Sequence, residues 1–178
     1  MTTNRHRVGG HVNPKSLPRG PNGRALCRQC GVEVPKGRRT FCGDQCVDQW
    51  KIKTDPTFVR IKLFDRDRGV CALCGLDTVK TLKELHDLDA FYDIQYSHAR
   101  RYDIKANITL KARLQDLGIS VSRYVGVRYC HYGIWDADHI VPGVEGGGEC
   151  GLDNYRTLGC RCHNQETAKL ARRRSKVL

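Results

Sequence analysis

Closely spaced cysteine pairs constrain the fold of this 178-residue chain more than any other feature. Eight of its ten cysteines form four pairs: Cys27 with Cys30, Cys42 with Cys46, Cys71 with Cys74, and Cys160 with Cys162. In a reducing compartment such pairs are metal ligands more often than disulfides. Because only 7% of the residues are aromatic and 39% are hydrophobic, we expect bound metal to supplement a modest core.

The first residues of the chain contain no apolar stretch of the kind that a secretory signal needs. We therefore expect a reducing compartment: the cytoplasm of a bacterium or of a phage-infected cell, or the nucleus if the source is eukaryotic. No apolar run is long enough to span a membrane, so a soluble protein is expected. A secreted, disulfide-rich protein stays open as an alternative, because ten is an even number of cysteines.

Positive charge dominates the sequence. The chain carries 31 Lys and Arg residues against 19 Asp and Glu, a net charge of +12, which favours a polyanionic partner such as nucleic acid. No acidic residue precedes Glu33, and residues 1–24 are predicted to form a disordered basic arm. Whether this arm follows phosphates or is a solvated tail stays open.

The first two cysteine pairs have the spacing of a zinc module. Zinc prefers four thiolates in a tetrahedron, which two short knuckles can supply without much core. The sequence predicts such a four-cysteine module over residues 25–54, with Cys27, Cys30, Cys42 and Cys46 as ligands. Four buried free cysteines are the alternative.

A second pattern lies near the end of the chain. Asp138-His139-Ile-Val-Pro142 precedes a glycine loop, Asn154 and then Cys162-His163. This order resembles the HNH endonucleases, whose ββα-metal core carries the Asp-His pair on a first strand, the Asn in the hairpin loop and the last His on a helix. The resemblance implies an α+β fold: a small zinc-stabilised HNH core over residues 55–178, with the four-cysteine module before it and a helical insertion at about 77–134.

The resemblance also implies roles for the site residues. His139 would be the general base that activates water, Asp138 and His163 would hold Mg²⁺ or Mn²⁺, and Asn154 would tie the loop to the strand that carries the base. One carboxylate and one imidazole leave open positions on a hard cation for phosphate oxygen and water. Because neighbours on a regular strand point to opposite faces, we expect the strand to bend or end at Asp138 and His139.

HNH proteins further place a structural zinc between a first cysteine pair and a second one beside the last His. Here the ligands would be Cys71, Cys74, Cys160 and Cys162, which makes this the second structural Zn²⁺ site. The family usually has C-x2-C before the His, whereas this chain has the C-x-C of Cys160 and Cys162. Cys150 or Cys130 is an alternative to Cys160.

Apolar spacing predicts helices within residues 81–88 and 108–118, the second ending at a glycine suited to its C-terminus. A helix over residues 58–64 is expected to be capped by Thr57. Alternation predicts a strand over residues 123–130. After His163, a helix over residues 164–174 ends in a basic run.

The resemblance implies a metal-dependent DNA endonuclease that leaves 5′-phosphate and 3′-hydroxyl ends. The alternative is a zinc-stabilised DNA-binding module with an inactive nuclease site. DNA is the expected partner, with no membrane and no small-molecule substrate; no pattern specifies an oligomeric state. The region before Cys71 resembles the module that precedes the nuclease domain in an annealing-helicase family of replication-fork repair, and the chain also resembles standalone bacterial and phage HNH proteins. Repair and phage DNA processing both stay open.

Overall fold

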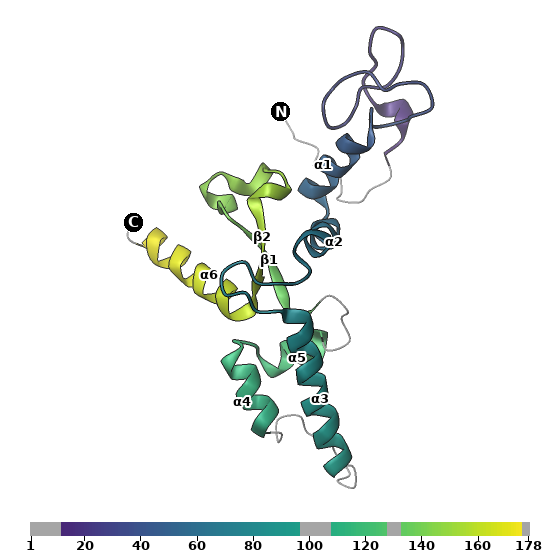
Figure 1. Cartoon of the computed structure of the whole chain (residues 1–178). Helices are drawn as coiled ribbons and strands as arrows, with labels where there is room; N and C mark the ends of the chain where they lie inside the picture. The colour runs from purple at the N-terminus through teal and green to yellow at the C-terminus, as the bar shows by residue number, and fades with distance from the viewer. Residues whose placement is uncertain (1–11, 97–107, 128–132, 176–178) are drawn as a thin grey trace. The chain divides into compact units, whose positions relative to one another are not determined.

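The computed structural model describes residues 12–96, 108–127 and 133–175 of the chain (Figure 1). The chain divides into two compact units. One contains residues 1–62 and 141–154, and the other contains residues 63–140 and 155–178. Helices and a two-stranded sheet occur together, which confirms the predicted α+β class.

The first unit contains the four-cysteine module, built around a very small core. Ala25, Cys27 and Val34 are its buried residues, and Leu17 and Phe41 pack against them. Isolated antiparallel bridges join Arg19 to Ala25 and Leu26 to Glu33, in place of regular strands. The 3-10 helix η1 (Pro14–Ser16) and helix α1 (Asp44–Thr54) flank these turns.

The structure differs from the expected basic arm over residues 12–24. These residues turn back onto the four-cysteine module, because Leu17 packs on its core and Glu33 holds the chain nearby. The Glu33 carboxylate accepts hydrogen bonds from the backbone N–H groups of Asn22 (3.0 Å) and Arg24 (2.8 Å). The first eleven residues of the arm lie outside the described residues, and the predicted domain boundaries stay predictions.

Helix α2 (Pro56–Asp67) follows α1 directly. The sequence predicted that Thr57 caps the N-terminus of this helix, and that prediction was wrong. Asp55 caps the helix, since its Oδ1 accepts from the N–H groups of Thr57 (3.0 Å) and Phe58 (3.2 Å). Pro56 then occupies the first helical position, where its missing N–H costs no hydrogen bond.

The second unit contains a β-hairpin followed by a helix. Strand β1 (Trp135–His139) pairs antiparallel with β2 (Tyr155–Gly159), with His139 opposite Tyr155 and Trp135 opposite Gly159. Helix α6 (Cys160–Ser175) begins directly after β2. Trp135 and Leu158 are almost fully buried. The order strand, strand, helix is the ββα arrangement that the sequence predicts.

The end of α2 supports this hairpin. Asp67 accepts from the Thr157 hydroxyl at 2.8 Å, and Arg66 donates to both Asp67 and the Tyr155 carbonyl, the latter at 2.8 Å. The Arg66 guanidinium, together with Thr157, lowers the pKa of Asp67 below its usual value. Arg66 and Asp67, the last two residues of α2, thus hold β2 in position through its residues Tyr155 and Thr157.

Three helices form the insertion: α3 (Thr78–Tyr96), α4 (Ile108–Asp116) and α5 (Val121–Val127). They share a core in which Leu85, Leu110 and Tyr124 are fully buried, and Figure 1 shows α4 beside α3. Helix α4 ends at a Schellman motif, with Ile119 N–H bonded to the Leu114 carbonyl at 2.9 Å and Gly118 at φ +68°. The predicted glycine terminus is confirmed.

The predicted strand over residues 123–130 was wrong where the structure describes it. Residues 121–127 form α5 instead. Ser120 explains the difference, because its hydroxyl accepts from Arg123 N–H (3.2 Å) and its carbonyl from Tyr124 N–H (3.0 Å), a capped first turn. Burial of Tyr124 in the helical core then overrides the alternating pattern.

Three short 3-10 helices shape the loop between β1 and β2: η3 (Gly143–Glu145), η4 (Gly147–Glu149) and η5 (Leu152–Asn154). Among the described residues, no helix combines the length and the apolar composition needed to cross a membrane.

Candidate active site

A cross-strand ion pair fixes the first predicted metal ligand. Asp138 on β1 lies opposite Arg156 on β2, and Arg156 Nε donates to Asp138 Oδ2 at 2.8 Å. Arg156 also donates to Glu166 of α6 at 3.1 Å. Burial lowers the pKa of Arg156, but the bonds to both carboxylates outweigh it and raise that pKa overall. One oxygen of Asp138 is therefore held in place, and the other is left for a ligand.

His163 faces that second oxygen. It lies in the first turn of α6, with Nε2 3.8 Å from Asp138 Oδ1. Two ligands of one octahedral Mg²⁺ lie about 3 Å apart when adjacent and about 4 Å apart when opposite, given bonds of about 2.1 Å. The Asp138–His163 distance lies between these two values, so its oxygen and nitrogen are close enough to reach one divalent cation.

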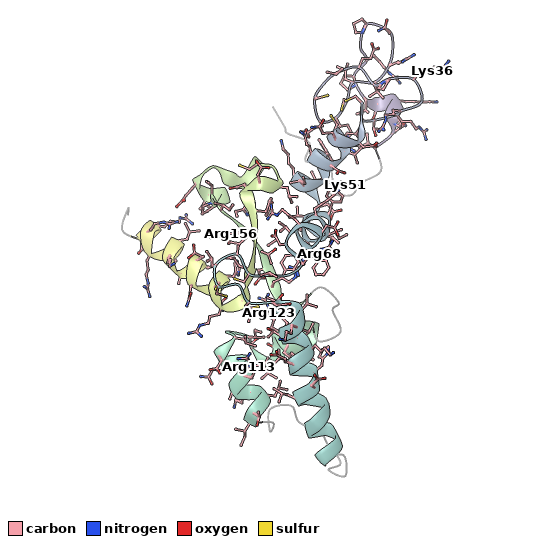
Figure 2. The ribbon with its side chains drawn as sticks, in the orientation of Figure 1. Lys36, Lys51, Arg68, Arg113, Arg123 and Arg156 are labelled. Carbon is pink, nitrogen blue, oxygen red and sulfur yellow. The ribbon has the colours of Figure 1, made fainter. Side chains whose placement is uncertain are left out.

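Asp136 contacts the other nitrogen of the same imidazole. Its Oδ2 lies 3.3 Å from His163 Nδ1. Asp136 is itself held by Arg123 of α5, whose terminal nitrogen donates to both carboxylate oxygens at 2.7 and 2.8 Å. Asp136 and Asp138 are two residues apart on β1, so they share one face of the strand. Figure 2 labels Arg123 and Arg156, which hold these two carboxylates.

His139 ends β1, as the sequence predicts for this position. Its ring stacks obliquely on Tyr155, its cross-strand partner, with 4.1 Å between the ring centroids. In the described part of the chain the imidazole makes no hydrogen bond and no ion pair. Its nitrogens are thus available to accept a proton.

Asn154 closes the loop that follows β1. Its Oδ1 accepts from Val141 N–H at 2.9 Å, and its Nδ2 donates to the carbonyls of Val141 and Gly147, both at 3.0 Å. A Cβ on Gly147 would overlap with the Val141 carbonyl, which explains a glycine at this position. Val141 lies two residues after His139, so the amide fixes the backbone that leaves the strand.

The sulfur atoms of Cys27, Cys30, Cys42 and Cys46 all lie within 4.8 Å of one another. Sulfurs around a tetrahedral zinc lie about 3.8 Å apart, given Zn–S bonds of about 2.3 Å, so this group could hold the ion. Burial raises the pKa of Cys27, but backbone N–H groups, that of Cys30 first, outweigh it and lower the pKa to about 6. Such amide-bonded thiolates are suited to metal binding.

A second group contains three thiols: Cys71, Cys74 and Cys162, again within 4.8 Å. Its knuckle repeats the geometry of the first, because Gly75 N–H bonds to the Cys71 carbonyl at 2.9 Å as Gly31 N–H bonds to that of Cys27. Backbone N–H groups, that of Gly159 first, outweigh the effect of burial and lower the pKa of Cys71 to about 7.

The structure does not bring Cys160 to this group, which differs from the sequence-based expectation. Cys160 Sγ lies 3.9 Å from the Ile134 carbonyl, within the core of the insertion. Cys160 and Cys162 both belong to the first turn of α6, where residues two apart point to opposite sides. Cys150 lies in the first unit and Cys130 outside the described residues. The nine described cysteines are free thiols.

Comparison with known proteins adds to this geometry. Residues 128–169 match the model of the HNH endonuclease family. The chain carries a domain of the HNH endonuclease family. Three curated relatives are named "DNA annealing helicase and endonuclease ZRANB3". The mouse and human proteins are 32% identical to this chain over 164 residues, and the cattle protein is 33% identical over 157 residues.

These relatives are much longer than this chain. The alignments cover 85 to 87% of it but only 14% of each relative. Among solved structures, the crystal structure of the human ZRANB3 HNH domain shares 26% sequence identity, with a TM-score of 0.41 over 70% of this chain and 96% of that one.

Three residues of the HNH domain's site escaped the sequence analysis: Arg123, Asp136 and Arg156. Asp136 had one available signal, because it lies two residues before Asp138 and hence on the same strand face. Arg123 comes from the insertion, and no sequence pattern could have identified it, since its contact with β1 depends on how α5 packs. Arg156 pairs across the hairpin, which follows only once the register is known.

Cys160 and Cys162 lie on opposite sides of α6, so replacing each of them should affect the zinc content differently. Cys162→Ala should lose one zinc per chain, because its sulfur belongs to the thiol group. Cys160→Ala should keep the zinc content of the wild type, because its sulfur lies in the apolar core. Metal analysis of the purified variants measures both. Loss of zinc from Cys160→Ala with retention in Cys162→Ala would contradict this assignment.

Proposed function

We propose that this HNH domain is a metal-dependent endonuclease that hydrolyses DNA phosphodiester bonds. Facing donor atoms of Asp138 and His163, 3.8 Å apart inside the family-matched segment, carry the proposal. These two residues would hold Mg²⁺ or Mn²⁺. When bound, the cation would neutralise charge on the scissile phosphate and on the departing 3′ oxygen.

His139 is the proposed general base. Its imidazole accepts a proton from water while the water oxygen bonds to phosphorus and the bond from phosphorus to the 3′ oxygen breaks. The departing 3′ oxygen takes a proton from solvent water, so the products are a 5′-phosphate and a 3′-hydroxyl. Two observations favour this role: the His139 imidazole makes no hydrogen bond to any residue that the structure describes, and its ring stacks on Tyr155. Asn154 positions the backbone after the base and does not react.

Two thiol groups would bind structural zinc in the same proposal. Cys27, Cys30, Cys42 and Cys46 form the complete group, whereas Cys71, Cys74 and Cys162 supply three ligands of the other. The fourth ligand of the second site is not assigned among the described residues. Zinc at the second group would join the Cys71 knuckle to α6 and so help to hold His163.

DNA binding without cleavage is the second candidate function. One observation favours it: Asp138 and His139 are neighbours on a regularly paired strand, so their side chains leave opposite faces. An inactive domain would tolerate that divergence, whereas catalysis needs both groups at one phosphate.

A plasmid-nicking assay with Mg²⁺ or Mn²⁺ separates these functions. His139→Ala should slow nicking by roughly 10²- to 10⁴-fold, the usual contribution of a general base, and should keep DNA affinity and zinc content. Ile140→Ala, an exposed change at the adjacent residue, should nick like the wild type. If wild type and His139→Ala bind DNA equally and neither nicks it, the endonuclease proposal fails.

Asp136 is proposed as a positioning residue. By accepting a hydrogen bond from His163 Nδ1–H, it selects the tautomer whose Nε2 lone pair faces Asp138. Arg123 holds the Asp136 carboxylate in this orientation by donating to both of its oxygens. Loss of such a supporting carboxylate typically costs roughly 10- to 100-fold in metal affinity or activity.

Nitrogen NMR of metal-free protein at high pH tests this role directly. In the wild type, His163 should be the Nδ1–H tautomer, and in Asp136→Ala it should become a mixture of both tautomers. Asp65→Ala, which removes an exposed carboxylate from α2, should leave the His163 spectrum unchanged. An unaltered tautomer in Asp136→Ala would remove the proposed role of Asp136.

A further inference from the structure

An open cavity of about 320 Å³ lies in the four-cysteine module of the first unit. Backbone turns and small apolar residues form much of its wall, and no acidic and no aromatic side chain lines it. Five basic residues contribute to its lining, and together they define the basic cavity: Arg19, Arg24, Lys36, Arg38 and Arg39.

Two loops supply these basic residues, and both are fixed by the fold. The loop with Arg19 and Arg24 closes through Gly20 N–H to the Arg24 carbonyl at 2.8 Å. Glu33 also holds this loop, since its carboxylate accepts a hydrogen bond from Arg24 N–H at 2.8 Å. That hydrogen bond lowers the pKa of Glu33. The opposite loop turns at Gly37, which has φ +90°.

Buried residues join the two loops beneath the cavity. Ala25 and Val34 line it and also belong to the core that contains Cys27. Val34 N–H bonds to the Ala25 carbonyl at 2.8 Å. The basic side chains are therefore attached to a backbone that the thiol group helps to fix, which lowers the entropy lost on binding a ligand.

Two carboxylates lie near this cavity: Glu33, whose charge interacts with that of Arg24, and Asp44. Arg38 pairs with Asp44 at 2.9 Å, and Arg19 donates to the Gly23 carbonyl at 3.3 Å. Within the ranges that the structure describes, the side chains of Lys36 and Arg39 have neither a hydrogen bond nor an ion pair. Figure 2 labels Lys36 in its loop. Exposed cations gathered this way attract an anion.

Phosphate is the anion that this lining fits. Guanidinium groups bind phosphate oxygens with two parallel hydrogen bonds, and a lysine adds a point charge. Lack of an aromatic wall argues against base stacking, which single-strand binders use. Contacts limited to phosphates would be independent of base sequence.

We propose that the basic cavity binds backbone phosphates of duplex DNA, so that the four-cysteine module anchors the DNA which the HNH domain cuts. This inference rests on the proposed function for its choice of DNA. Its residues are separate from Asp138, His139 and His163, and binding can therefore be measured without cleavage.

Fluorescence anisotropy of a labelled duplex, in buffer free of Mg²⁺ and Mn²⁺, tests the anchor over a salt series. The cavity variant is Arg24→Ala/Lys36→Ala/Arg39→Ala. Its matched control, Lys80→Ala/Lys83→Ala/Lys111→Ala, removes the same charge from exposed positions on α3 and α4, none of which lines the cavity. Zinc content identifies any variant that has lost its fold.

Loss of two or three phosphate contacts should weaken binding of the cavity variant by roughly 10- to 100-fold and reduce the salt slope by about two. The control should bind within about threefold of wild type, because its lysines do not line the basic cavity. Arg24→Lys/Arg39→Lys keeps both charges but loses the paired hydrogen bonds, so its affinity should fall between those of the wild type and the cavity variant.

Equal weakening of the cavity variant and its control would overturn the proposal, because it would indicate net charge alone. Unchanged binding by the cavity variant would overturn it as well, as would binding to phosphatidylserine vesicles but not to DNA. A wild type that does not nick DNA, with a cavity variant that loses binding, would instead reject the endonuclease and keep the anchor.

Discussion

The candidate site depends on the two ion pairs that the Arg156 guanidinium makes. A hairpin of two strands has little core of its own, and Arg156 joins β1, β2 and α6 by binding Asp138 and Glu166 from one guanidinium. Its side chain and that of Asp138 are 20% and 16% exposed. Removing one partner of such a part-buried pair should cost more than the about 1 kcal/mol of an exposed pair and less than the about 3–5 kcal/mol of a fully buried one. It would also release the carboxylate that faces His163.

Helix α6 receives support on two sides, which fixes the position of its first turn. Cys162 contacts the Cys71 knuckle, while Cys160 packs in the insertion core. His163 follows these two cysteines directly. The insertion also contacts the candidate site, because α5 carries Arg123, which holds Asp136 near Nδ1 of His163. The insertion therefore supports one of the residues that we propose to hold the catalytic metal.

Local chemistry was predictable from sequence, and contacts between distant segments were not. Spacing or the family pattern predicted the Cys27 group, the Asp138–His163 pair and the glycine end of α4. The structure brings the side chains of the first two sets close together, and it confirms the glycine end. Alternation failed at α5, where the Ser120 cap and the burial of Tyr124 decide the structure. Cys160 lies in the insertion core rather than with the thiol group, because a C-x-C at the start of a helix directs its two sulfurs to opposite sides. The position of Arg123 depends on how the insertion packs.

The metal assignment can be tested on the ion itself. Pulsed electron paramagnetic resonance of the protein loaded with Mn²⁺ reports whether a histidine nitrogen binds the ion. We predict a nitrogen coupling in the wild type and in His139→Ala, and its loss in His163→Ala. A coupling that survives in His163→Ala, or that disappears in His139→Ala, would show that Asp138 and His163 do not form the metal site.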